Sequence, residues 1–457
     1  MSPAALTPAD IKRMIDDRPR DGAFRVHRSV FSDPRVFELE MKHIFERGWV
    51  FLGLASQLPK KHDYLTTQIG RQPVVIMRDG DGKLGAFLNS CRHKGATVCQ
   101  LTHGNRKLHV CPYHGWSYDS GGRSRAIKGK DQGAYPACFD KESHDLAALP
   151  MFAEYRGLLF GSLSREVETL EEYLGEARKL IDLVVDQGEH GLELVPGAVS
   201  FTFAGNWKLQ LENCSDAYHF TSTHPSYLRV LDRRAQAQAA GTPQSIWDND
   251  RPYSPGAEGI TSGTFSFANG HVLNWLVTKP SPVHPLFETI DALTSRVGEA
   301  RRDWMFNTRN LTLFPNVQIA ENASSQLRII RPVAPDRTEM LTYCIAPIGE
   351  SAVARKRRIR QYEDFFNPTG LATPDDAILY EDCQATHRAP VGEWLQGYMR
   401  GMTAKQTSTA PLSASIDLHP QSSVLGGPEL CDETVFHTYY RTWRERLIAG
   451  LVHEAAA

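Results

Sequence analysis

Residues 91–116 read CRHKGATVCQLTHGNRKLHVCPYHGW and contain two cysteine–histidine pairs. Cys91 is followed by His93, and Cys111 is followed by His114, each on a predicted turn between strands. Two thiolates and two imidazoles can hold one tetrahedral zinc ion. The same donors can also hold a pair of irons, with both cysteines on one iron and both histidines on the other. The spacing alone therefore predicts a metal site and leaves these two metals open.

The residues around the pairs favour iron. CRHKGA (91–96) and CPYHGW (111–116) resemble the two cluster-binding loops of Rieske proteins, including a glycine two residues after the first histidine and Gly-Trp after the second. Because neutral imidazoles replace two anionic thiolates, a Rieske cluster accepts an electron at a higher potential than an all-cysteine cluster. The resemblance implies that one 2Fe–2S cluster binds at Cys91, His93, Cys111 and His114.

One departure separates this chain from the Rieske proteins of respiratory complexes. Those proteins carry an additional cysteine in each loop, and the two additional cysteines form a disulfide. Here Ala96 and Tyr113 stand at the corresponding positions, so no such bridge can form. The resemblance is therefore to the oxygenase or ferredoxin branch.

The surrounding sequence, residues 49–163, is typical of a small all-β domain, because short apolar runs alternate with Gly, Asp and Asn turns. Within it, Gly80, Gly82 and Gly85 match the Gly-x-Gly-x-x-Gly pattern of dinucleotide-binding loops. The sequence that follows predicts another strand rather than a helix whose N-terminus could hold a pyrophosphate. The glycines therefore predict a hairpin turn, and redox chemistry would need a separate protein to handle the nicotinamide.

Residues 164–457 mix helical and strand patterns. Apolar spacing predicts helices at 166–187, 206–220, 351–366 and 435–449, and strands at 198–205, 310–320, 325–334 and 339–348. The Ser-, Thr-, Pro- and Gly-rich stretch 403–427 predicts a long loop. The helix at 351–366 carries a cationic cluster, which indicates a solvated helix face more strongly than a docking patch for an acidic electron donor. That cluster consists of Arg355, Lys356, Arg357, Arg358 and Arg360.

A second group of metal-binding residue types lies in DAYHFTSTHP, residues 216–225. Asp216 and His219 are three residues apart, so on a helix they share a face. His224 would be rotated away on a straight helix, but Pro225 disfavours helical geometry for the residue before it. The helix should therefore end near Thr223 and let His224 turn back towards His219. Taken alone, His-x4-His is a weak signal, and two core histidines are the ordinary reading.

The residues around these two histidines indicate what the histidines bind. LENCSDAYHFTSTH, residues 211–224, resembles the catalytic-domain motif of Rieske ring-hydroxylating oxygenases. The resemblance implies that His219 and His224 bind a mononuclear Fe(II). It also implies a carboxylate ligand far downstream, for which we choose Asp376, with Asp375 as the alternative. Two histidines and one carboxylate leave iron with open positions for dioxygen beside the substrate.

The resemblance extends over nearly the whole chain, to the large α subunit of benzoate, toluate and anthranilate 1,2-dioxygenases. It is carried by both metal motifs and by residues 24–53, 155–163, 205–213, 309–319 and 365–376. It implies an α+β fold in which an all-β Rieske domain, residues 49–163, is inserted into a catalytic domain. Residues 1–48 and 164–457 would form that catalytic domain, with an antiparallel sheet covered by helices in a helix-grip arrangement.

The resemblance also implies a reaction. A separate NADH-dependent flavin and iron–sulfur reductase, acting directly or through a ferredoxin, would pass electrons to the cluster and then to the mononuclear iron. The oxygenase would use O2 to dihydroxylate an aromatic carboxylate of the benzoate, anthranilate or 2-halobenzoate class. A Rieske monooxygenase acting on a hydroxybenzoate such as salicylate, or on a quaternary amine, is the alternative.

Further expectations concern assembly and individual residues. Family members are usually trimers of α, most often with a small β subunit, and the cluster of one subunit serves the iron of its neighbour. Asp216 matches the bridging carboxylate of the family, which hydrogen-bonds His219 and a cluster histidine of the neighbouring chain. We also expect Asn213 to line the substrate pocket. The sequence does not identify the Arg or Asn that would bind the substrate carboxylate.

Composition excludes several other classes of function. The chain has 457 residues, with 51 Lys and Arg against 53 Asp and Glu, so charge gives no reason to expect nucleic acid or an anionic membrane as partner. We expect a cytoplasmic protein, because the N-terminus lacks the apolar stretch of a signal peptide and no segment approaches the roughly 20 apolar residues of a membrane span.

Six cysteines without a histidine at metal-ligand spacing are expected to be small buried hydrophobes. They are Cys99, Cys138, Cys214, Cys344, Cys383 and Cys431.

Overall fold

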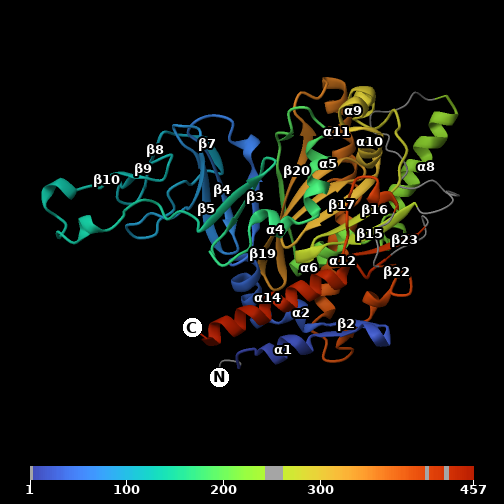
Figure 1. Cartoon of the computed structure of the whole chain (residues 1–457), viewed down its shortest axis with the longest axis horizontal. Coiled ribbons are helices and arrows are strands. Elements are labelled where there is room, and N and C mark those ends of the chain that lie inside the picture. The colour runs from blue at the N-terminus through green and yellow to red at the C-terminus, as the bar shows by residue number, and fades with distance from the viewer. Residues whose placement is uncertain (1–3, 242–260, 407–410, 427–431, 457) are drawn as a thin grey trace. The chain divides into compact units, whose positions relative to one another are not determined.

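The computed structural model describes residues 4–241, 261–406, 411–426 and 432–456. The chain folds into two compact units, one formed by Met1–Glu40 with Glu171–Ala457 and the other by Met41–Leu170 (Figure 1). Among the described residues, no helix has both the length and the apolar character that a membrane span requires.

The Met41–Leu170 unit is built from antiparallel strands. Its sheets have the strand orders β6-β5-β4-β7, β10-β9-β8 and β11-β12-β3. The strands are β3 (Val50–Leu54), β4 (Asp63–Ile69), β5 (Gln72–Arg78), β6 (Leu84–Leu88), β7 (His103–Asn105), β8 (Leu108–Val110), β9 (Ser117–Asp119), β10 (Ser124–Ala126), β11 (Met151–Tyr155) and β12 (Leu158–Ser162).

The central strand β5 separates two apolar cores within this unit. Its VVIM run is fully buried on both faces, as expected when successive side chains point to opposite sides of a sheet. Val74 and Ile76 pack into one core, which also contains residues of β3, β4 and β12. Val75 and Met77 pack into the other core, which contains both Cys91 and Cys111. The sheet therefore supports the two cysteine–histidine loops from behind.

The glycine-rich turn between β5 and β6 confirms the predicted hairpin. Gly82 has φ +90° and donates its N–H to the carbonyl of Asp79 at 3.1 Å. The strands pair in register on either side, and β6 follows the turn where a dinucleotide-binding loop would have a helix. The three glycines of the Gly-x-Gly-x-x-Gly match therefore do not form a dinucleotide-binding loop.

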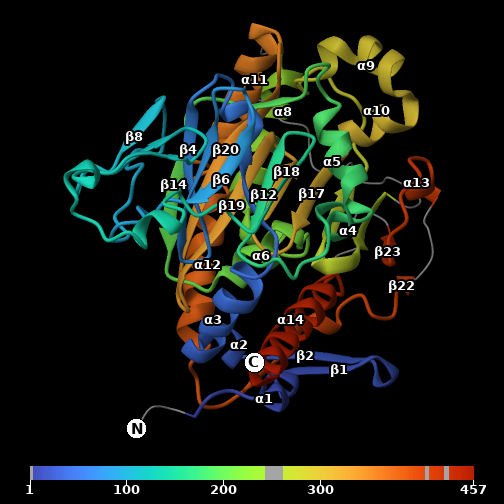
Figure 2. The same ribbon diagram turned by 60° about the vertical axis from the view of Figure 1, so that its left-hand side comes forward.

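The larger unit is centred on an antiparallel sheet with the order β13-β20-β19-β18-β17-β16-β15-β23-β22, and β14 also pairs with β20 (Figure 2). The strands are β13 (Leu192–Leu194), β14 (Val199–Phe203), β15 (Ser262–Ser266), β16 (Val272–Leu276), β17 (Thr308–Leu313), β18 (Val317–Glu321), β19 (Ser325–Ala334), β20 (Arg337–Pro347), β22 (Lys405–Gln406) and β23 (Ser422–Gly426). Helices cover the sheet, so the predicted α+β class is confirmed.

The helices of this unit are interspersed with its strands along the sequence. They are α4 (Leu170–Leu174), α5 (Ala177–Val185), α6 (Trp207–Ser215), α7 (Phe220–Thr223), α8 (Pro225–Ala239), α9 (Ile290–Val297), α10 (Glu299–Phe306), α11 (Ala352–Phe365), α12 (Thr373–Thr386), α13 (Pro411–Ala414) and α14 (Phe436–Ala456). Helix α6 contacts β16, β17 and β19 near the middle of the sheet. This helix leads directly into the segment that carries His219 and His224.

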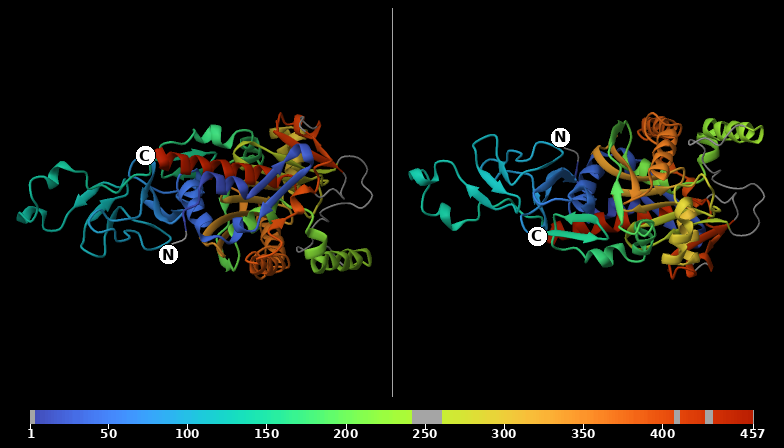
Figure 3. Two further views of the ribbon diagram at one scale, coloured as in Figure 1. Left: turned by 90° about the horizontal axis from the view of Figure 1, so that it is seen from below. Right: turned by 90° about the horizontal axis from the view of Figure 1, so that it is seen from above.

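The N-terminal segment belongs to the larger unit. Its elements are α1 (Pro8–Arg13), β1 (Ile15–Arg18), β2 (Ala23–His27), α2 (Ser29–Ser32) and α3 (Pro34–Glu40), and β2 pairs with β21 (Trp394–Leu395). Figure 3 shows the blue N-terminal segment beside the red helix α14, which α1 contacts. At the end of α3, the buried Glu40 accepts hydrogen bonds from Trp207, Lys208 and Trp443 at 2.6–2.8 Å. Because its partners lie on α6 and α14, Glu40 ties the N-terminus to the helix that precedes the histidine segment.

Several element boundaries differ from the sequence predictions. The helix predicted at 166–187 is split into α4 and α5, because Gly175 adopts a left-handed φ of +49° between them. The strand predicted at 310–320 is two strands, β17 and β18, which pair with each other. The loop predicted at 403–427 contains β23, which pairs with β15, and Ser423 and Val424 of β23 are buried. A Ser-rich composition concealed this strand, because its pairing partner lies far away in sequence.

The cationic cluster on α11 is only partly the solvated face that we predicted. The side chain of Arg358 is 1% exposed and pairs with Glu350 at 2.6 Å, so the prediction is wrong for this residue. Arg355 also pairs with Glu350, and with Glu193 at 2.7 Å. These carboxylates lie within reach of the helix face and draw the two arginines inward. Arg360 remains on the surface beside Glu363.

The cysteines divide into two groups. Cys99, Cys214 and Cys344 are buried, as predicted, whereas Cys138 and Cys383 are exposed, so the prediction is wrong for those two. Cys431 lies outside the described residues.

Alkylation should separate the two groups of cysteines. Burial raises the pKa of Cys99 and of Cys344 to about 12, so at about pH 8 only ~0.01% of either thiol is the reactive thiolate. We expect iodoacetamide to modify the exposed Cys138 while Cys99 and Cys344 of the folded protein stay unmodified. Peptide mass mapping of native and denatured samples measures this, and equal labelling of Cys99 and Cys138 in the native sample would contradict the packing described.

Candidate metal centres

The two cysteine–histidine loops share one backbone design. In each loop the cysteine N–H donates to the carbonyl five residues later, at 2.8 Å for Cys91 and 2.7 Å for Cys111. The cysteine carbonyl accepts the N–H of a glycine, Gly95 in the first loop and Gly115 in the second. Both glycines have a left-handed φ, +79° and +77°. This conformation favours glycine over other residues, which explains why each motif places a glycine near its histidine.

The four side chains of these loops are arranged as an inner and an outer pair. Cys91 and Cys111 are 3% and 2% exposed, within the apolar core below the loops. His93 and His114 lie further out and are partly exposed, with their Nδ1 atoms 3.0 Å apart. At most one proton fits between two nitrogens at this distance, so lone pairs converge there. Buried sulfurs and outer imidazoles form a donor set that fits one iron on the cysteines and a second on the histidines.

Tyr118 adds a hydrogen bond to this group. Its hydroxyl accepts the N–H of Arg92 at 3.1 Å, which leaves its own proton available for the Cys91 sulfur at 3.2 Å. Burial, with the neighbouring Cys91 thiol, raises the pKa of Tyr118, so the hydroxyl keeps this proton. A donor to a cysteine sulfur stabilises the more negative, reduced state of a cluster.

We therefore expect Tyr118→Phe to lower the reduction potential of the cluster. One hydrogen bond of about 1 kcal/mol corresponds to a decrease of ~40 mV for a one-electron couple. A potentiometric titration followed by visible absorbance or electron paramagnetic resonance measures the change. Tyr135→Phe, in the same unit, is the control and should leave the potential unchanged; equal potentials for wild type and Tyr118→Phe would refute the bond.

The second candidate centre is assembled at the ends of helices. Helix α6 ends at Ser215, so the helix predicted through residue 220 is wrong, and Asp216 and His219 do not share a helical face. A bend instead brings His219 Nδ1 to 3.1 Å from Asp216 Oδ2. Helix α7 ends at Thr223, and His224 follows it with non-helical φ −110° and ψ 39°. The proline effect on His224 is therefore confirmed.

His219, His224 and Asp376 converge on one point. Asp376, in the first turn of α12, places its Oδ1 3.2 Å from His224 Nε2 and 3.5 Å from His219 Nε2. The three ligand atoms lie within 4.8 Å of one another. Asp375 is 39% exposed, and its Oδ2 lies 3.6 Å from the other nitrogen of His224. Of the two adjacent aspartates, the structure brings Asp376 into the group.

Asn213 is the amide donor at this centre. Its Nδ2 lies 3.0 Å from Asp376 Oδ1 and 3.2 Å from His219 Nε2. Three electron-pair donors around such a small space fit a cation, and two imidazoles with one carboxylate suit ferrous iron.

Burial alone would raise the pKa of Asp376, but the hydrogen bond from His224 and the charges of both histidines outweigh it and lower that pKa. The carboxyl group is therefore ionised, as a metal ligand must be.

Asp216 controls the orientation of His219. Its Oδ2 accepts from His219 Nδ1, and its Oδ1 accepts the N–H of Tyr218 at 2.5 Å. A proton held on Nδ1 leaves the Nε2 lone pair free to face Asp376. Burial opposes protonation of His219, but the bonds and charges of Asp216 and Asp376 raise its pKa overall.

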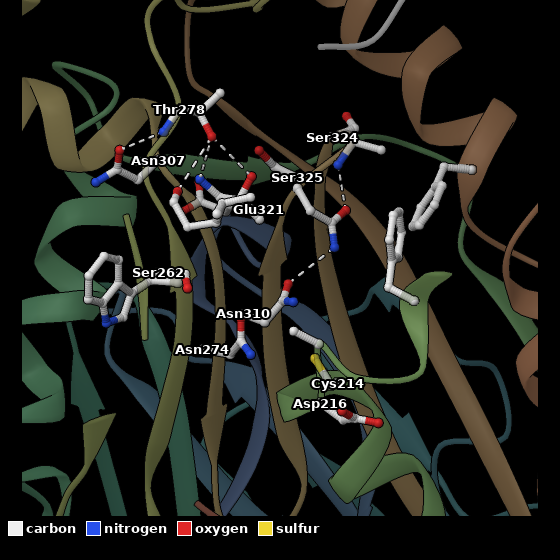
Figure 4. Close-up of a pocket in the computed structure, with 18 of the residues that line it drawn as sticks. Cys214, Asp216, Ser262, Asn274, Thr278, Asn307, Asn310, Glu321, Ser324 and Ser325 are labelled. Atoms are coloured by element: carbon white, nitrogen blue, oxygen red, sulfur yellow. Dashed lines mark hydrogen bonds between the residues drawn. The ribbon is translucent and has the colours of Figure 1, made fainter. Parts of the chain in front are cut away.

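A cavity of about 220 Å³ adjoins the His219, His224 and Asp376 group (Figure 4). Part of its lining is apolar: Phe220, Trp275, Leu276, Met305, Phe306 and Phe365. Across the sheet, Thr264, Asn274 and Asn310 lie on paired positions of neighbouring strands and give this wall a row of polar groups. Asn213 lines the cavity, where the sequence prediction placed it. Most of the other residues that line the cavity were not predicted from the sequence. The alternation of side chains along a strand shows that the strand has two faces, but not which face lies towards the metal site.

Comparisons with known proteins agree with both centres. The family described as Rieske [2Fe-2S] domain matches residues 48–150. The family described as ring hydroxylating alpha subunit (catalytic domain) matches residues 177–447. The first match contains both cysteine–histidine loops, and the second contains the histidine and aspartate group.

Relatives match over nearly the full length of the chain. Toluate 1,2-dioxygenase subunit alpha of Pseudomonas putida is 43% identical over 97% of this chain and 95% of that protein. Anthranilate 1,2-dioxygenase large subunit of Acinetobacter baylyi is 39% identical over 97% and 94%. Among solved structures, naphthalene 1,2-dioxygenase with indole in its active site superposes with a TM-score of 0.79 at 25% identity, over 99% of this chain and 98% of that one. The chain therefore belongs to the Rieske non-heme iron ring-hydroxylating dioxygenases, as one of their large, or alpha, subunits.

Proposed function

We propose that this subunit adds both atoms of dioxygen to adjacent ring carbons of an aromatic carboxylate. The observation that carries the proposal is the cavity of about 220 Å³ beside His219, His224 and Asp376, with aromatic side chains on some walls and amides on others. Apolar walls suit a benzene ring, and a few polar groups suit one charged substituent. The relatives named for toluate, 2-halobenzoate and anthranilate support this substrate class.

The proposal assigns a role to each predicted site residue. Cys91, His93, Cys111 and His114, in the segment 49–163, hold the 2Fe–2S cluster, and His219, His224 and Asp376 hold the mononuclear iron. When bound, these groups supply stored electrons and the activation of dioxygen. Asp216 keeps the proton of His219 on Nδ1, and Asn213 donates to Asp376 and keeps its carboxylate oriented.

Electrons come from outside the chain in this proposal. An NADH-dependent reductase, directly or through a ferredoxin, reduces the cluster. We propose a trimer of this subunit, alone or with a small β subunit, in which the cluster of one subunit serves the iron of the next. Asp216 then bonds His219 in its own chain and a cluster histidine of its neighbour, and its carboxylate gives a short path between the two imidazoles.

Oxygen labelling tests the reaction class. The iron-loaded enzyme, its reductase and NADH are incubated with benzoate, anthranilate, salicylate or 2-halobenzoates under labelled dioxygen. Benzoate should give a cis-dihydrodiol, and anthranilate or a 2-halobenzoate should lose its substituent and carbon dioxide to give a catechol. Two labelled oxygens per product support a dioxygenase; one labelled oxygen would show a monooxygenase instead.

A further inference from the structure

Among the described residues that line the cavity beside the histidine and aspartate group, Arg328 is an arginine without a direct ion pair. Among the described lining residues, the arginines are Arg328 and Arg358. Arg358 is neutralised by Glu350 at 2.6 Å and donates to Ser325 at 2.7 Å. Arg328, on β19, forms no ion pair with a carboxylate in the described part of the chain. Its guanidinium instead lies 5.3 Å from the ring centroid of Phe366.

The geometry of Arg328 leaves its two terminal nitrogens available. Its Nε donates to Gln326 Oε1 at 2.5 Å, and Gln326 precedes it on the same face of β19. Within the described residues, the terminal nitrogens form no hydrogen bond. A guanidinium held through Nε presents these nitrogens as a fork, which matches the two oxygens of a carboxylate. In the described part of the chain the guanidinium interacts electrostatically with Asp376 without a direct ion pair, so this half-buried cation still favours an anionic ligand at its terminal nitrogens.

Arg328 also lies at the end of the cavity that is next to Asp376. It lines the large cavity and, with Asp376 and Tyr380, a small adjoining pocket. A 1,2-dioxygenation of an aromatic acid oxidises the ring carbon that carries the carboxylate together with its neighbour. The carboxylate must therefore lie close to the residues that hold the iron. Through Gln318 of β18, Arg328 is level with Thr312, near the C-terminal end of β17, whereas Asn307, labelled with Thr278 in Figure 4, precedes the first residue of that strand.

We propose that Arg328 binds the substrate carboxylate through its two terminal nitrogens and that Gln326 positions the guanidinium for this contact. The inference rests on the proposed function and specifies which residue selects for an acid. It makes the charge of the substrate, rather than the size of its ring, the main determinant of affinity at this end of the cavity.

The test compares benzoate with its neutral isostere benzamide, using the iron-loaded enzyme. Calorimetric titration without reductase gives binding constants, and steady-state assays with reductase give kcat and KM. Arg328→Gln should weaken benzoate binding and raise its KM by roughly 100-fold, because a bidentate charged contact is lost. Benzamide binding should change by less than about threefold. Arg328→Lys, which keeps the charge and loses the fork, should fall between wild type and Arg328→Gln.

Arg331→Gln is the matched control, because Arg331 lies on the same strand and pairs with Glu339. It should bind benzoate as the wild type does. Visible spectra and iron content establish that each variant is folded and loaded, and Arg328→Lys provides the comparison where Arg328→Gln fails this check. Wild-type benzoate affinity in a folded Arg328 variant would overturn the inference and leave the proposed function intact. A wild-type enzyme that oxidises benzamide and other neutral arenes but no aromatic acid would overturn the proposed function and the inference with it.

Discussion

Alanine in place of Asp376 is expected to remove the mononuclear iron and to lower substrate oxidation by more than about 100-fold, since even residues that only support a metal ligand contribute 10–100-fold. The carboxylate of Asp376 is the anionic member of the group and lies within 3.5 Å of both histidines. Without it, two neutral imidazoles remain, and ferrous iron is weakly held by imidazoles alone. The 2Fe–2S cluster should be unaffected, because all its proposed ligands lie between residues 91 and 114.

The adjacent residue provides a closely matched control. Asp375→Ala removes the same chemical group one position earlier on the same helical turn, and the Asp375 side chain is the more exposed of the two. Iron and acid-labile sulfide should be measured for both variants after anaerobic loading. We expect loss of iron without loss of sulfide in Asp376→Ala, and Asp375→Ala should retain both iron and sulfide after the same loading. The reverse pattern would assign the ligand to Asp375.

Replacing Asp216 by alanine is the second change with a large expected effect. We expect the cluster spectrum to persist while substrate oxidation falls by more than about 100-fold. Asp216 fixes the tautomer of His219 and, in the proposed trimer, bonds the cluster histidine of the next chain. Both the orientation of an iron ligand and the path for electrons would fail together.

Two readouts distinguish a role in electron transfer from a general loss of structure. Sulfide content and the cluster spectrum should remain near wild type, and in molecules that retain the mononuclear iron the pre-reduced cluster should reoxidise far more slowly when substrate and dioxygen are added. Asp336→Ala, which removes a surface carboxylate that pairs with Arg388, should behave as the wild type. Normal turnover in Asp216→Ala would remove the proposed role.

The parts of the site that could be predicted from sequence are those whose residues are close together along the chain. The cysteine–histidine loops each span a few residues, and a glycine in each loop adopts the conformation that favours glycine. His219 and His224 were found for the same reason, and Pro225 correctly indicated where the helix ends. Asp376 was chosen from a family resemblance, because no spacing rule links it to the histidines.

One of the errors had a local signal in the sequence, whereas the others depend on contacts that form only in the folded protein. The helix expected through residue 220 ends at Ser215, and the Asn-Cys-Ser-Asp stretch at its end contains poor helix formers that could have indicated this. The burial of Arg358 depends on Glu350 and Ser325, which contact it only in the folded protein. Arg328 could not be recognised from the sequence, since its significance depends on its place at a cavity wall, where it forms no direct ion pair with any carboxylate of the described residues.

Mössbauer spectroscopy of protein loaded with isotopically enriched iron measures whether two different iron centres are present in one polypeptide. We predict that about two thirds of the iron belongs to a coupled pair with both cysteine and histidine ligation and about one third to a mononuclear high-spin ferrous site. In Asp376→Ala the mononuclear signal should disappear while the pair remains. A spectrum with a single kind of iron in the fully loaded wild type would contradict the account.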